Sequence, residues 1–186
     1  MRRWGLVLLI GLLAGCGGGS TGEFGDVTLA LDSPPDANDA GVYLASERGY
    51  DQAEGVTFKI VRGGPSDFSL RTDADLRRSK DLVGVMAIVQ PAKLVLCVPR
   101  ETLSEQRDMV AAAVRALQRG YEQAQLEPDE AVQAMAQGVP GLDAARISAQ
   151  LDSVSPSWSA GAPFLGALPA GREFDRSVAA AQPANQ

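Results

Sequence analysis

The feature that most constrains the fold is a strand, a helix and a second strand joined by short links near the amino end of the chain. The apolar segment 26–31 predicts a buried strand, and the alternating segment 56–61 predicts a second one. Between them, residues 37–48 place small and apolar side chains on one helical face, with Asp36 as the expected N-cap and Gly49 as the stop. Two strands joined by one helix favour a parallel βαβ unit, so the chain is predicted to have an α/β fold.

Two further apolar strands, residues 82–89 and 93–98, follow each other closely in the sequence. A parallel crossover between strands needs about a dozen residues or more. These two strands are therefore predicted to be adjacent and antiparallel in one sheet, within a single α/β lobe.

The second half of the sequence is predicted to be helical. Residues 105–125, 130–136 and 144–151 carry apolar side chains at helical spacing. Pro128 suits the first turn of the middle helix, and Asp143 is the expected cap of the last one. We expect these helices to pack on the sheet and to carry no chemistry.

The amino terminus predicts export. Arg2 and Arg3 precede an uncharged, apolar or small segment, residues 4–14. That segment is too short to span a bilayer, which needs about 20 apolar residues, but it suits a signal peptide. It leads into Leu13-Ala14-Gly15-Cys16, which is similar to a lipobox, so Cys16 is the predicted lipidation site. The alternative is an ordinary secretory signal followed by a chance cysteine.

Composition excludes several classes of function. The chain has no histidine, which removes the commonest metal ligand and the usual proton shuttle, and no carboxylate pair stands out by its spacing. We therefore expect no enzyme, no metal site and no cofactor. Removing residues 1–15 moves the net charge from −6 to −8, which argues against nucleic acid as a partner.

If Cys16 is lipidated, Cys97 has no disulfide partner, and it is predicted to be a buried, inert thiol.

A ligand site is expected at the carboxyl ends of the first two strands, where open α/β sheets bind their ligands. The candidate ligand-binding residues are Asp32, Ser33, Asn38 and Asp39 after the first strand, and Gly63, Gly64, Ser66 and Asp67 after the second. The carboxylates accept hydrogen bonds, so a neutral or cationic ligand rich in donors, such as an aminopyrimidine, is favoured over an anionic sulfonate. In the alternative interpretation, Asp32, Asp36 and Asn38 cap and brace the turn after the first strand, and Gly63 and Gly64 only form the turn after the second strand.

The segment from Leu31 to Tyr43 (LDSPPDANDAGVY), together with Gly63-Gly64-Pro65-Ser66-Asp67, resembles the substrate-binding proteins of ABC importers. The specific resemblance is to the binders of thiamine pyrimidine precursors, taurine and sulfonates. Residues 87–90 (AIVQ), 94–103 (LVLCVPRETL) and 119–121 (RGY) extend it in the same order. It implies a type II periplasmic-binding-protein-like first lobe, a small-molecule ligand and an ABC permease as partner.

Three departures from that family pattern affect the prediction. The family usually has an aromatic side chain where this chain has Ser33, and often a histidine where it has Asp39. Residues 67–81 are shorter than the corresponding helix and strand of the family. The second lobe, which in relatives lies between the two close strands, is replaced by Gln90, Pro91, Ala92 and Lys93.

The predicted organisation is a signal peptide (residues 1–15), a lipid anchor and tether (16–25), a reduced solute-binding-like α/β domain with C-terminal helices (26–170) and a disordered tail (171–186). The predicted protein is held by its lipid on the extracytoplasmic face of a membrane. Its expected function is solute binding for an ABC importer. The alternative is a reduced, non-transport lipoprotein that no longer closes on a ligand. Yeast relatives that make the thiamine pyrimidine use histidine and a cysteine-rich motif, and this chain has neither.

Overall fold

The computed structural model describes residues 23–89 and 94–158. The predicted signal peptide, Cys16 and the tail at 171–186 lie outside the described residues. The strands are β1 (Gly25–Leu31), β2 (Val56–Arg62), β3 (Phe68–Thr72), β4 (Leu82–Val89) and β5 (Leu94–Pro99). The helices are η1 (Ala37–Asp39), α1 (Ala40–Glu47), α2 (Tyr50–Ala53), α3 (Asp73–Arg78), α4 (Arg100–Glu105), α5 (Arg107–Leu126), α6 (Pro128–Gly138), α7 (Ala144–Val154) and η2 (Ser155–Ser157).

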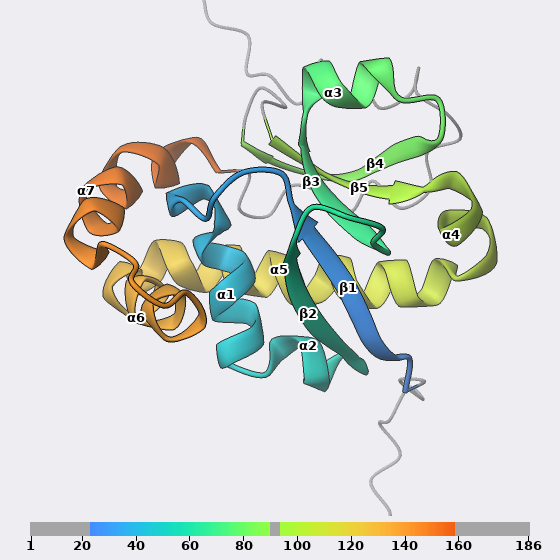
Figure 1. Cartoon of the computed structure of the whole chain (residues 1–186). Coiled ribbons are helices and arrows are strands. Elements are labelled where there is room, and N and C mark those ends of the chain that lie inside the picture. Colours follow the sequence, from blue (N-terminus) through green and yellow to red (C-terminus); the bar gives the residue numbers. More distant parts are fainter. Residues whose placement is uncertain (1–22, 90–93, 159–186) are drawn as a thin grey trace, which may run out of the picture.

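The described strands form one mixed sheet in the order β2-β1-β3-β5-β4 (Figure 1). β1 is parallel to both β2 and β3, which confirms the predicted βαβ unit. β5 is antiparallel to β4, as the short link between them predicts, and it is also antiparallel to β3. The α/β fold class expected from the sequence is confirmed, and the described residues contain one sheet.

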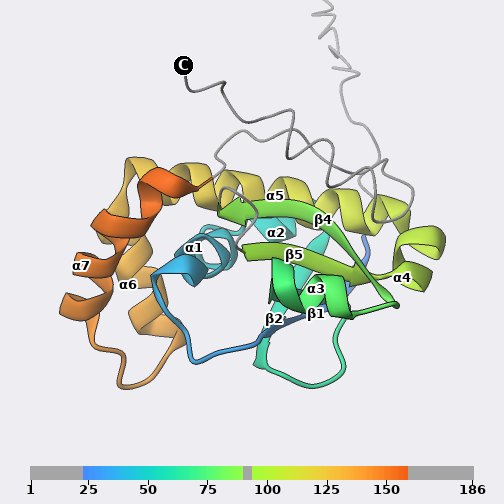
Figure 2. The same cartoon turned by 90° about the horizontal axis from the view of Figure 1, so that it is seen from above.

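The sheet has one strongly apolar face. Val27, Leu29 and Leu31 of β1 and Phe58 of β2 point to the same side and are buried in the main core. Figure 2 shows α1, α2 and α5 on this side of the sheet and α3 on the other. Residues 40–45 of α1 are all buried, because α5 and α6 pack against the helix, and only its last residues, Ser46 and Glu47, are polar.

Helices α1 and α5 cross at two glycines. A Cβ atom placed on Gly120 would lie 2.2 Å from the carbonyl oxygen of Gly41 and 2.7 Å from Cβ of Ala45. A Cβ atom placed on Gly41 would lie 2.4 Å from the ring of Tyr121. The backbones of the two helices therefore approach so closely that only glycine fits at the crossing.

The structure corrects several expected elements. The predicted helix 37–48 is a 3-10 turn, η1, followed by α1, and a separate helix, α4, precedes α5. Residues 67–81, for which no element was predicted, contain β3 and α3. Helices α6 and α7 were expected to pack on the sheet, but α6 packs mainly on α1, and α7 packs on α6 and η1, because α1 already covers that end of the sheet.

Candidate functional site

The two loops expected to form the site do come together. β1 and β2 are parallel and in register, so both end at the same edge of the sheet. The backbone N–H of Gly63 donates to the carbonyl of Leu31 at 3.0 Å, which holds the two loops side by side. Gly63 and Gly64 have φ of 59° and 88°, and the left-handed conformation lets residues 63–67 turn back across β1 towards β3.

The loop after β1 is held by a capping box. Asp36 Oδ1 accepts the backbone N–H of Asn38 at 2.8 Å and its Nδ2 at 3.0 Å, while Asp39 Oδ2 accepts the backbone N–H of Asp36 at 3.0 Å. This confirms Asp36 as the N-cap. The hydroxyl of Tyr121 on α5 donates to the carbonyl of Asn38 at 2.7 Å and so fixes the turn to the core.

The other two candidate carboxylates also have partners within the chain. Asp32 pairs with the guanidinium of Arg71, on β3. Asp67 Oδ2 accepts the backbone N–H of Thr28 at 2.8 Å. Thr28 comes directly before Leu29, which is the first residue of β1 that pairs with β3. Asp67 therefore extends the hydrogen bonding of β1 and does not point out from the edge. Asp32, Ser33 and Gly64 are the exposed members of the predicted set.

Burial changes the protonation of one candidate residue. Asp39 is 5% exposed, and this desolvation raises the pKa of its carboxyl to about 7. The hydrogen bond from the Asp36 backbone lowers the pKa, and the negative charge of Asp36 raises it, but both effects are smaller than that of desolvation. The same desolvation raises the pKa of the Tyr121 hydroxyl well above its usual range. Burial raises the pKa of the Cys97 thiol to about 12, consistent with the buried, inert cysteine that the sequence predicts.

We expect Asp39 to make stability depend on pH. Its folded pKa lies above the ordinary 3.8, so its protonated form favours the folded state. The contribution is fully present below about pH 4 and is lost as the pH rises through about 7. Asp39→Asn keeps an acceptor for the Asp36 N–H and removes the titration. Urea unfolding between about pH 4 and 8 checks this, and an equally steep fall in stability for Asp39→Asn over that range would contradict it.

Sequence reasoning missed the basic and phenolic side chains of this edge. Arg71 was missed because residues 68–72 were not recognised as a strand, and it is Arg71 that neutralises Asp32. Tyr121 lies in the predicted helix 105–125, and no short-range pattern indicates that its hydroxyl reaches a turn 83 residues away in sequence. No group of three or more potential metal ligands occurs among the described residues.

The five-stranded mixed sheet and its flanking helices form an α/β fold of the periplasmic-binding-protein-like kind. The structure is similar to that of a conserved Candida albicans gene product that defines a protein family with the generic periplasmic binding protein fold. The match has a TM-score of 0.55 and 8% sequence identity, and it covers 73% of this chain and 82% of the other. No family model and no curated protein sequence matches the chain. At this identity the likeness establishes the fold alone.

Proposed function

We propose that this chain is a lipid-anchored, extracytoplasmic solute-binding protein of an ABC importer, with an aminopyrimidine as its ligand. The observation that carries the proposal is the fold: a periplasmic-binding-protein-like sheet whose β1 and β2 loops meet at one edge. The resemblance of residues 31–43 and 63–67 to pyrimidine and sulfonate binders falls on those same two loops. Loops at the carboxyl ends of parallel strands are where such sheets bind ligands.

A panel of thiamine, cytosine and methanesulfonate tests this proposal by thermal shift. A ligand at 100 times its dissociation constant adds about 2.7 kcal/mol of stability, which raises the melting temperature of a chain this size by roughly 5–10 °C. The proposal predicts such a shift with thiamine or cytosine and none with methanesulfonate. A flat response to all three compounds would contradict it.

One observation favours the second candidate, a reduced, non-transport lipoprotein. Asp32, Asp39 and Asp67 each have a partner within the chain, so they are already used in bracing the loops. An edge open on one side also buries much less of a ligand than the 70–90% typical of small-molecule sites. Under this alternative the same panel gives no shift.

The membrane anchor is a separate prediction. Cys16→Ala removes the thiol that would accept the lipid, so we expect loss of lipid labelling and retention of the unprocessed precursor. Metabolic labelling with palmitate and the mobility of the protein in gels measure both. Labelling of the Cys16→Ala protein at the wild-type level would contradict the anchor. None of the helices in residues 23–89 and 94–158 is long and apolar enough to cross a bilayer.

A further inference from the structure

Backbone hydrogen-bonding groups of β2 face away from β1, along the outer edge of the sheet. β2 is an outer strand of the sheet, so the backbone N–H and C=O groups of successive residues point alternately towards β1 and away from it. The N–H of Phe58 donates to the buried carboxylate of Asp51 at 2.9 Å, so the backbone of Phe58 faces away from β1. By the same alternation, the N–H and C=O of Ile60 face outwards, and no partner for them lies in the described part of the chain.

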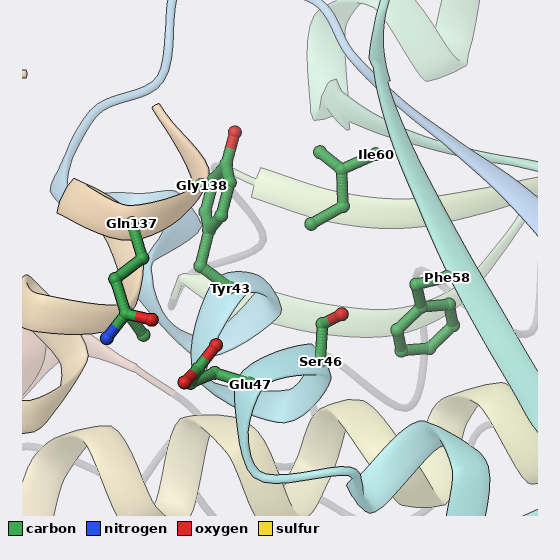
Figure 3. A pocket seen from close by; sticks show the side chains of 8 residues that line it. Tyr43, Ser46, Glu47, Phe58, Ile60, Gln137 and Gly138 are labelled. Carbon is green, nitrogen blue, oxygen red and sulfur yellow. The ribbon is translucent and has the colours of Figure 1, made fainter. Parts of the chain in front are cut away.

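A pocket of about 370 Å³ opens beside this edge (Figure 3). Phe58, Ile60 and Tyr43 provide apolar walls from β2 and α1, and α6 closes the other side. A Cβ atom on Gly138 would lie 2.7 Å from the Tyr43 ring, so the end of α6 is in close contact with that wall. The remaining lining residues are Ser46, Glu47, Ala134 and Gln137. The space is large enough for one apolar side chain beside the exposed backbone of Ile60.

The two ends of this edge carry charges of opposite sign. Glu47 lies at the last turn of α1, which runs back towards the start of β2, and its side chain lines the pocket. Arg62 ends β2 on the face shared with Phe58 and Ile60. Burial and the charge of Asp39 raise the pKa of the Tyr43 hydroxyl, and the positive charge of Arg62 opposes that rise. Both side chains are exposed and have no ion-pair partner among the described residues. The edge is therefore acidic near the start of β2 and basic at its end.

We propose that this edge binds a short peptide with free termini, lying parallel to β2. Its ammonium group pairs with Glu47 and its carboxylate with Arg62, its main chain hydrogen-bonds to Ile60, and one apolar side chain enters the pocket. Phe58 to Arg62 spans roughly 13 Å of extended chain, which three or four ligand residues match. An antiparallel peptide would place like charges together at both ends. This site is distinct from the β1 and β2 loops, and it does not depend on the function proposed for them.

Titration of the full-length chain with the tripeptide Ala-Leu-Ala tests the proposal, with the acetylated and amidated peptide as the matched control. We expect Ala-Leu-Ala to bind with amide shifts at Ile60, and the capped peptide to bind at least tenfold more weakly. Glu47→Gln and Arg62→Gln should each weaken Ala-Leu-Ala about tenfold, whereas Glu122→Gln, on the exposed side of α5, should change nothing.

Ile60→Pro removes the outward N–H of an edge strand, where proline is tolerated, and should abolish binding, whereas Ile60→Val should retain it. If Ile60→Pro does not fold, the two charge variants decide the question. The proposal is overturned if Ala-Leu-Ala does not bind or if the capped peptide binds equally well. It is also overturned if amide shifts fall away from β2, or if the edge is occupied by a second copy of the chain, seen as a concentration-dependent dimer.

Discussion

Replacing Gly120 by alanine is expected to lower the free energy of unfolding by about 3 kcal/mol, at the upper end of the usual cost of overpacking. The added Cβ would meet the backbone oxygen of Gly41 at 2.2 Å and the Cβ of Ala45 at 2.7 Å, and neither atom can move without shifting α1. Helix propensity alone predicts the opposite sign, because alanine is favoured over glycine in a helix by about 1 kcal/mol.

Urea unfolding measures the difference, with Glu122→Ala on the exposed side of the same helix as the control. That control should change stability by no more than about 0.5 kcal/mol. A Gly120→Ala protein as stable as the wild type would show that α1 and α5 do not approach each other this closely.

Removing the side chain of Tyr121 is expected to have an effect of similar size. Tyr121→Ala should cost about 3–5 kcal/mol, because the ring is fully buried and packs edge-on against Trp158 with ring centroids 5.1 Å apart. Tyr121→Phe keeps the ring and removes only the hydroxyl that donates to the carbonyl of Asn38, so it should cost about 1 kcal/mol.

The two Tyr121 variants separate packing from the hydrogen bond that fixes the turn. Chemical unfolding of both, with hydrogen exchange at Asn38 and Asp39, checks the division. Equal losses for Phe and Ala would mean that the hydroxyl, and not the ring, carries the contribution of this residue.

The order of elements could be predicted where the sequence pattern is local. The strand–helix–strand unit and the antiparallel pair follow from hydrophobic periodicity and from the length of the links, and both are present. β3 escaped prediction because it is only five residues long and includes Ser69 and Arg71, so its apolar signal is weak. Its place between β1 and β5 is set by pairing with strands distant in sequence.

The candidate site was predictable in position but not in its internal contacts. Parallel topology brings the loops after β1 and β2 together, and that much follows from the sequence. The partners of Asp32 and Asp67 are Arg71 and the backbone of Thr28, which lie 39 residues away in each case. The alternative interpretation, in which Asp36 and Asn38 brace the turn, describes their observed hydrogen bonds well. The predicted ligand contacts remain predictions.

Binding of thiamine to the wild type and to Ser33→Tyr, measured by calorimetry, tests the proposed ligand site most directly. Ser33 is exposed beside the candidate loops, at the position where the resembling family usually has an aromatic side chain. Stacking of a base on an aromatic ring contributes about 1–3 kcal/mol, so Ser33→Tyr should bind thiamine roughly 5- to 150-fold more tightly than the wild type. Absence of binding by both proteins, or tighter binding of methanesulfonate than of thiamine, would contradict the proposal that this edge of the sheet is an aminopyrimidine site.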